Sequence, residues 1–519
     1  MTGPSPQALA RMQLECARQE AREHQRRLMQ GLGRPIVSFE DNGYRVVCVG
    51  NEVRWSKAWH TFADFLLDYI KMKLTPAWGN AELAKPDAER HPLLRWFAIM
   101  GEVQQALAKQ PNGLYQSQMT GAIRAYLGLA YDLYLCAHNA ELPNLLLKRL
   151  RNAQTFEGAL YEARVIVSLA KAGFNIELED ETDSERSHCE LTAAHKDTGR
   201  KFSVEAKAVT SLSARSGAST EPPRIRSQLY KALGKRADHE RMIFIELNRA
   251  GINPSADVPE WVRHIDADID LAEKEITIDG KPAPSAYVFV TNFGAIHALD
   301  STRFTEFGLS RGFKISDFGS RTSARSILEL VDAREKHREL HWLQKALQTH
   351  QSIPSTFDDR LPEELNDDSV PRLMIGGTYR IPIEGGQETL GILTDATVLE
   401  PERKAYGTYR CQDGRHVICV SPLTEAELRA YRRSPETFFG VLKFVSPQIT
   451  EPLDCYDFFW ESYGRTSKEK LLEFIKDWPD SETFRPLDQY RLAQVYCARF
   501  AENLWATHRR AQSRSTKVT

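Results

Sequence analysis

The sequence predicts a multidomain protein of the α+β class, and three observations support this. The chain has 519 residues, several times the usual length of one domain. Apolar residues recur at helical spacing in the first 150 residues, whereas helical and strand-like segments alternate after them. Short strand-like segments separated by turns return near residue 372. We therefore expect five parts: a mainly helical domain (1–151), an α/β domain with a mixed sheet (152–320), a helix and linker (321–371), a small β-rich domain (372–450) and a helical segment (451–519).

The first part consists mainly of helices. Residues 6–30 are strong helix formers that end at Gly31, and a strand-like hairpin follows around Gly50-Asn51. Trp59, Phe62, Leu66 and Tyr69 lie at helical spacing in a helix that we expect Pro76 and Gly79 to end. Further apolar-periodic helices are predicted at 92–108, 117–138 and 142–151.

The second part begins with a long helix from residue 152 that Gly173 ends. Three strands follow, FNIELEDE, CELTAAH and KFSVEAKAV, and the turn 196–200 joins the last two. A basic helix (224–237) leads to the apolar strand RMIFIELN, and after an intervening loop comes the strand SAYVFVTNF. This order, αβββαβ(α)β, is typical of a mixed sheet with flanking helices.

The remaining parts return from helix to strand and back to helix. We expect a charged helical stretch at 322–349. The Pro- and Asp-rich stretch 352–371 indicates a linker. Four short strands, TYRIPI, TLGILTDATVL, GTYRCQ and RHVICVSPL, have turns at Gly385-Gly386 and Asp413-Gly414. Residues 466–513 are again helical, and a basic polar tail follows.

The composition of the chain limits which kinds of nucleic-acid, cysteine and membrane sites we expect. With 42% hydrophobic residues, 27% charged residues and a net charge of −2, the chain is not coated in positive potential, so a nucleic-acid site must be a local basic patch. The eight cysteines form no CxxC pair. The polar N-terminus and the absence of any run of eighteen apolar residues lead us to expect a cytoplasmic protein without a membrane span.

The hairpin of the second part carries the candidate chemistry. Side chains alternate along a strand, so Glu205 and Lys207 share one face with Ser203. Glu190 lies fifteen residues before Glu205 on the preceding arm, within reach of the same face if the register allows it. Converging carboxylates repel each other, and a divalent cation with oxygen ligands relieves that repulsion. The pattern therefore predicts a Mg²⁺ site, for which Mn²⁺ would substitute, with Lys207 beside it.

These residues resemble the PD-(D/E)xK nuclease superfamily, which includes restriction endonucleases and many recombination and repair nucleases. The likeness rests on His188-Cys189-Glu190 and Val204-Glu205-Ala206-Lys207 and covers roughly 150 residues. Cys189 stands where the motif has proline, and Glu190 where it has aspartate.

The resemblance implies a restriction-endonuclease-like domain and a Mg²⁺-dependent phosphodiesterase with Glu190, Glu205 and Lys207 as catalytic residues. It implies a further metal ligand on the preceding helix, Glu162, with Glu157 as the alternative. It also implies that the following helix faces DNA through Arg224, Arg226, Gln228, Lys231 and Lys235. Between Lys196 and Arg241 there are 11 Lys and Arg against 5 Asp and Glu, an excess that suits a phosphate backbone.

Other interpretations remain beside this one. An ExK triplet taken alone is typical of a solvated strand face. His188 and His195 bracket Glu190 and would allow a histidine-carboxylate metal site, although histidines on strands are more often surface groups. By analogy with the superfamily, we expect a role in restriction or anti-phage defence. The protein would act as a homodimer or with a partner protein, and RNA is an alternative substrate. The alternative function is a non-catalytic nucleic-acid-binding or assembly protein on a degenerate nuclease fold.

Overall fold

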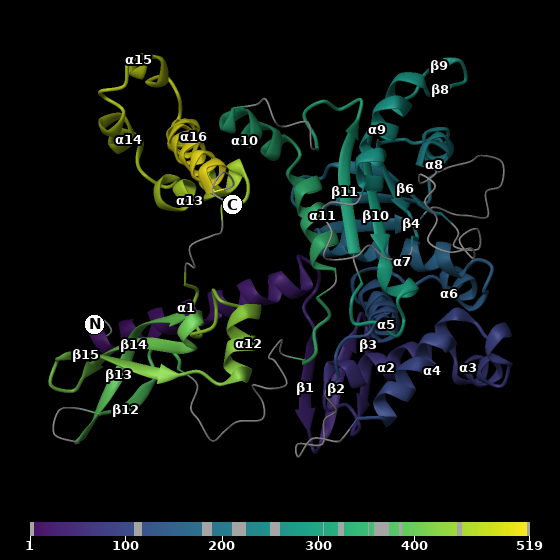
Figure 1. Ribbon diagram of the computed structural model, residues 1–519, viewed down its shortest axis with the longest axis horizontal. Helices are drawn as coiled ribbons and strands as arrows, with labels where there is room; N and C mark the ends of the chain where they lie inside the picture. The colour runs from purple at the N-terminus through teal and green to yellow at the C-terminus, as the bar shows by residue number, and fades with distance from the viewer. Residues whose placement is uncertain are drawn as a thin grey trace. The chain divides into compact units, whose positions relative to one another are not determined.

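The computed structural model describes residues 5–107, 117–178, 189–209, 225–249, 260–304, 306–319, 326–350, 352–357, 373–382, 387–443 and 449–515. It is a mixed α and β structure with several sheets (Figure 1). The chain divides into two compact units, each built from two stretches of sequence. The first unit is Met1–Lys314 with Trp342–Lys443, and the second is Ile315–His341 with Phe444–Thr519.

The first unit starts with helices and one small sheet. The helices are α1 (Pro6–Gln30), α2 (Phe62–Leu74), α3 (Pro76–Leu83), α4 (Pro92–Gln105), α5 (Gly121–Asn139) and α6 (Asn144–Arg151). Strands β1 (Val37–Asp41), β2 (Tyr44–Val49) and β3 (Glu52–Ser56) form an antiparallel meander. Gly31 ends α1 with a φ of +67°, a conformation that glycine adopts without strain. As expected, α2 ends before Pro76, at Leu74, whereas Gly79 lies inside α3, which Pro76 begins because proline suits the first helical position.

A six-stranded mixed sheet forms the centre of the first unit, in the order β11-β10-β7-β6-β5-β4. Strands β4, β5 and β6 are antiparallel, β6, β7 and β10 are parallel, and β11 is an antiparallel edge strand. The strands are β4 (Phe174–Leu178), β5 (Leu191–His195), β6 (Lys201–Ala208), β7 (Glu240–Glu246), β10 (Ala286–Phe293) and β11 (Glu306–Phe313). The edge strand β11 lies outside the strand set predicted from the sequence.

Helices cover both faces of this sheet. The helix α7 (Phe156–Lys171) packs against β6 and β4. On the other face, α8 (Ile225–Leu233) and α9 (Glu260–Glu275) share an apolar core with Ile243 and Ile245 of β7. The parallel register pairs Glu205 with Ile243 and Lys207 with Ile245, and paired residues share a face. Glu205 and Lys207 therefore lie on the α8 face of the sheet.

The rest of the first unit holds most of α11 (Arg338–Thr349), from Trp342 onward, and a small β region. The single helix predicted at 322–349 is wrong in its continuity: α10 (Ile327–Lys336) ends at His337, whose φ of −115° is not helical, before α11 begins. Strands β12 (Thr378–Pro382), β13 (Glu388–Leu399), β14 (Lys404–Cys411) and β15 (His416–Pro422) form one antiparallel sheet. This sheet shares a core with α12 (Glu425–Arg433).

The second unit is helical. Besides α10 it contains α13 (Pro452–Tyr463), α14 (Lys468–Phe474), α15 (Ser481–Phe484) and α16 (Gln489–Ser515). A short hairpin, β8 (Thr277–Ile278) with β9 (Lys281–Pro282), belongs to the first unit and follows α9. Across the described ranges, the search for a helix both long and apolar enough to span a bilayer found none.

Candidate active site

The β5–β6 hairpin places the two predicted strand carboxylates. The regular register runs from Ala194 opposite Lys201 to Leu191 opposite Val204. Glu190 lies just before β5 rather than on it. Its backbone N–H donates to the Val204 carbonyl at 3.0 Å, one residue off the register of the ladder. The side chain extends the pairing to the residue before β5 begins, because Glu190 Oε2 accepts the N–H of Ala206 at 3.0 Å.

Glu190, Glu205 and Lys207 converge at this point. Lys207 Nζ forms an ion pair with Glu205 Oε1 and lies 3.5 Å from Glu190 Oε1. The Glu205 side chain is only 1% exposed, whereas those of Glu190 and Lys207 are 25% and 21% exposed. The Glu205 carboxylate is thus buried, whereas the Glu190 carboxylate and the Lys207 ammonium group are accessible to solvent.

A second lysine approaches the buried carboxylate. Lys235, just beyond the end of α8, lies with Nζ 3.7 Å from Glu205 Oε1. Among the described residues, Glu205 Oε2 is buried and has no hydrogen-bond donor. The sequence suggested Lys235 only as a DNA contact, because nothing local indicates that a residue thirty positions away returns to the hairpin.

The two helix carboxylates considered as a further ligand lie in different surroundings. Glu162 of α7 is buried and pairs with Arg149 at 2.7 Å, and its charge contributes to the pKa of Glu190. Glu157, one helical turn earlier, instead accepts a hydrogen bond from Asn248 Nδ2 at 3.1 Å. Of the two α7 carboxylates, Glu162 is therefore the one that interacts electrostatically with Glu190.

The electrostatics reflect crowding of negative charge. Burial and then the neighbouring Glu205 raise the pKa of Glu190 to about 7, against the opposing effects of Lys207 and the Ala206 N–H. Burial lowers the pKa of Lys207, but Glu190 and Glu205 outweigh it, so the net shift is upward. Lys207 is therefore a firmly charged ammonium group.

The donor set suits a hard cation only in part. Within the described ranges, no three His, Cys, Asp or Glu side chains form a group that would hold a metal ion by themselves. Glu190 and Glu205 nevertheless offer carboxylate oxygens on one side of the sheet, and Glu205 Oε2 is a buried acceptor without a donor in the described chain. Carboxylate oxygens are the ligands that Mg²⁺ prefers. These residues fit Mg²⁺ if substrate or solvent completes its shell.

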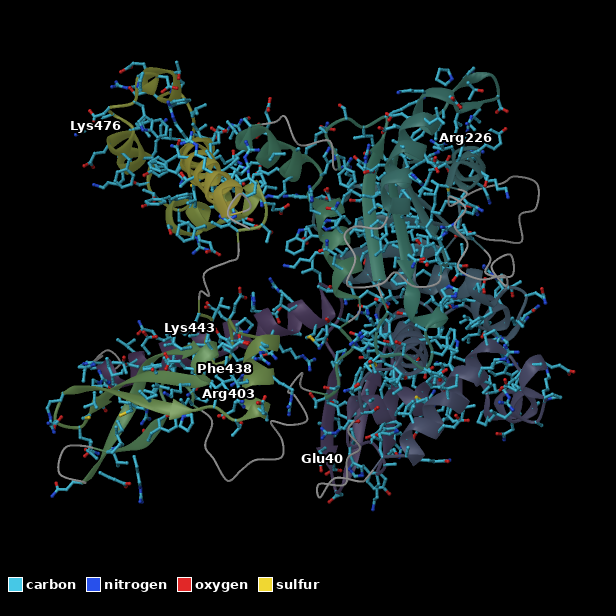
Figure 2. All side chains as sticks on the ribbon, in the orientation of Figure 1. Glu40, Arg226, Arg403, Phe438, Lys443 and Lys476 are labelled. Carbon is cyan, nitrogen blue, oxygen red and sulfur yellow. The ribbon has the colours of Figure 1, made fainter. Side chains whose placement is uncertain are left out.

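Three of the remaining predicted site residues, Arg226, Gln228 and Lys231, lie on α8. Arg226, labelled in Figure 2, is exposed and pairs with Glu275 at 2.6 Å. Lys231 is exposed and Gln228 half-buried, and Tyr230, which was not among the residues predicted from the sequence, is 54% exposed on the same helix. Arg224 and His188 lie outside the described residues.

His195 has a structural environment. It is buried, packs edge-on against Phe174 with ring centroids 5.0 Å apart, and lies 3.3 Å from the Thr198 hydroxyl through Nδ1. These contacts hold the β5–β6 turn.

A second buried polar cluster lies where the parallel strands β7 and β10 end. Glu246 accepts hydrogen bonds from the Thr291 hydroxyl at 2.7 Å, the Phe293 N–H at 2.9 Å and the Asn248 N–H at 3.2 Å. Asn248 has a φ of +52°, which costs energy for any residue except glycine. Glu246 was not among the predicted site residues, although a glutamate that closes the apolar run IFIE is a signal in the sequence.

Comparisons of the chain with protein-family models, with curated proteins and with solved structures found no match.

Proposed function

We propose that this chain is a metal-dependent nuclease that hydrolyses phosphodiester bonds, with DNA as substrate and a PD-(D/E)xK arrangement of residues. The observation that carries the proposal is the meeting of Glu190, Glu205 and Lys207 where β5 leaves β6. The order of α7, the antiparallel strands β4 to β6, α8 and the parallel strand β7 supports a restriction-endonuclease-like domain.

Each residue has a distinct task in this proposal. Glu190 and Glu205 would hold Mg²⁺, with Glu162 available as a further ligand. The bound ion would supply Lewis acidity toward a phosphate oxygen and lower the pKa of a coordinated water. The Lys207 ammonium group is solvent-accessible and orients the attacking water or neutralises the charge that develops on the phosphate. Lys235 holds the Glu205 carboxylate from the α8 side.

Exposed residues of α8 support a nucleic-acid substrate. Lys231 and Arg226 are exposed on α8, and the exposed Tyr230 ring lies on the same helix, where it is available for base stacking. We extend the proposal to Arg224 and Gln228 as contacts, to a cytoplasmic setting, and to restriction or defence against foreign DNA. RNA is the alternative substrate.

A cleavage assay with matched variants tests the activity. Purified protein is incubated with supercoiled plasmid, linear duplex, single-stranded DNA and structured RNA, with Mg²⁺, Mn²⁺ or EDTA. We expect metal-dependent cleavage that EDTA stops and that Lys207→Ala and Glu205→Gln reduce by about a hundredfold or more. Lys201→Ala, an exposed lysine on the same strand, is the control and should cleave like the wild type.

One observation favours the alternative function, a non-catalytic nucleic-acid-binding protein. Three carboxylates, Glu162, Glu190 and Glu205, stand beside three cations, Arg149, Lys207 and Lys235. The cluster is thus formally balanced without a metal ion. Binding of nucleic acid without cleavage under every metal condition would identify this alternative.

A further inference from the structure

A recess opens along the outer strand of the central sheet, away from the candidate active site. It lies between β10, β11 and α11 and has a cavity volume of about 180 Å³. Phe289 and Phe293 supply buried aromatic surface, and Ser310, Gln344 and Gln348 supply polar groups. We call this the Glu306 recess, after the carboxylate that lines it.

The Glu306 side chain is 3% exposed and only partly satisfied. Its Oε2 lies 3.4 Å from the Arg124 guanidinium, whereas its Oε1 is buried without a hydrogen-bond partner among the described residues. A buried carboxylate oxygen without a donor is costly. An N–H group from a ligand in the recess would remove that cost once a rotation of the Glu306 side chain brought Oε1 to the wall of the recess.

The charge of the recess restricts the ligand. Arg124 neutralises Glu306, and none of the residues that line the recess in the described chain is Lys or Arg. A phosphate or carboxylate would find no cation there, and a cationic ligand would meet a carboxylate that is already paired. The Gln344 amide nitrogen donates to the Ser310 hydroxyl, so the amide oxygen adds a second acceptor to the wall. The site thus suits a neutral, flat molecule rich in N–H donors.

We propose that the Glu306 recess binds a nucleobase that carries an exocyclic amino group. The amino group donates to Glu306 Oε1, and the ring lies on the apolar surface of Phe289 and Phe293. The base comes either from a free nucleoside or from an unstacked base of a nucleic acid, and both present the same edge to the carboxylate.

The recess is separate from the candidate active site. Register pairs Glu306 with Phe293 and Ser310 with Phe289, so these residues share one face. Phe289 is also paired with Phe244, on the face opposite to Ile243 and Ile245, which share their face with Glu205 and Lys207. Base binding therefore does not depend on the proposed nuclease chemistry.

Matched nucleosides test the chemistry of the ligand. Calorimetric titration of the full chain compares cytidine with uridine, and adenosine with inosine, since the second member of each pair carries a carbonyl oxygen in place of the amino group that would donate to Glu306. We expect the amino-bearing member to bind at least about tenfold more tightly. A short single-stranded oligonucleotide with one abasic site, compared with its intact form, shows whether the base is taken from nucleic acid instead.

Gly308 allows the recess to be blocked without disturbing the fold. It lies between Glu306 and Ser310 on β11, and a Cβ added there would meet nothing within 4 Å. Gly308→Phe should therefore fill the recess and abolish binding, whereas Gly308→Ala should bind like the wild type. Glu306→Gln should remove the preference for the amino-bearing base, and Lys207→Ala should leave binding unchanged.

Two results would overturn the proposal. One is the absence of saturable binding of every nucleoside and of any difference between the abasic and intact oligonucleotides. The other is binding that Gly308→Phe leaves intact, because the ligand would then lie elsewhere. Loss of DNA cleavage with nucleoside binding retained would instead count only against the nuclease proposal.

Discussion

The carboxylate of Glu205 shows how one residue ties the candidate site to the fold. It is buried, and its charge is balanced by Lys207 and Lys235 from two different elements. A metal ion that binds there has to compete with these ammonium groups or share the carboxylate with them. Metal binding is therefore measurable as a change in stability, independently of catalysis.

We predict that Mn²⁺ or Mg²⁺ raises the melting temperature of the wild-type chain. A ligand at a hundred times its dissociation constant stabilises the folded state by about 2.7 kcal/mol. Glu190→Gln and Glu205→Gln should abolish most of this gain, because each removes a ligand charge. Glu177→Gln, an exposed acid on β4, is the control. Thermal unfolding measures the rise in melting temperature. An equal rise in the wild type and in all three variants would contradict the proposed ligands.

Part of the site could be predicted from single residues. The period of two places Glu205 and Lys207 on one face, and their ion pair lies on that face. The position of Glu190 depends on where β5 begins, which the sequence does not mark. Arg149 reaches the cluster from α6, and Lys235 from the residues that follow α8. Their roles depend on packing between elements, so local patterns did not indicate them.

Lys171 is a buried charge outside the candidate site. Its side chain lies in the core of the first unit, where Nζ donates to the Thr349 carbonyl at 3.1 Å. Burial lowers its pKa to about 7, against the attraction of Asp132. Between pH 7 and the ordinary lysine pKa of 10.5, Lys171 is therefore mostly neutral in the folded state and protonated in the unfolded state.

We predict that this lysine makes the first unit more stable as the pH rises from 7 to 9. In that window the unfolded state carries the extra proton, so the free energy of unfolding gains up to about 1.4 kcal/mol per pH unit from this group. Lys171→Met should be more stable than the wild type at pH 7 and lose that advantage by pH 9. Urea unfolding at several pH values measures it. A difference that stays constant with pH would show that Lys171 does not titrate there.

At the scale of elements, the sequence predicts helix ends that a glycine marks, but it did not predict the edge strand of the central sheet. Gly31 and Gly173 follow α1 and α7 with positive φ, as expected for glycine after a helix. The edge strand β11 reads EFGLSRGF, with two glycines and Arg311, because it pairs on one side only. For α9 a signal was present, since Ile265, Ile269 and Ala272, and Ile276 directly after the helix, follow helical spacing into the core.

Two helical glycines make opposite predictions about stability. A Cβ at Gly121, the first residue of α5, would lie 2.2 Å from the Ala298 carbonyl oxygen. Gly121→Ala must therefore shift the helix end and should cost about 1–3 kcal/mol. A Cβ at Gly158 in α7 would meet nothing within 4 Å, so Gly158→Ala should stabilise by about 0.5–1 kcal/mol. Denaturant unfolding compares both with the wild type, and the same sign for both would contradict this packing.

At the scale of the whole molecule, the second unit joins segments far apart in the sequence. Ile327 and Val331 of α10 are buried in one core with Tyr456 of α13 and with Leu492 and Tyr496 of α16. Gln494 Nε2 donates to Glu335 Oε1 at 2.7 Å, which adds a polar link between α16 and α10. The helical stretch near residue 330 thus depends on residues more than a hundred positions later, which no local pattern in the sequence indicates.

We predict reciprocal destabilisation of α10 and α16. Val331→Asp places a charge in their shared core and should lower the stability of the second unit by about 3 kcal/mol. Hydrogen exchange should then accelerate in α16 as well as in α10, while the amides of β6 and β7 in the first unit keep their wild-type rates. Lys336→Ala, at an exposed position of α10, should change neither helix. Faster exchange confined to α10 would show that the two segments fold separately. Acceleration that reaches β6 would show instead that the two units unfold together.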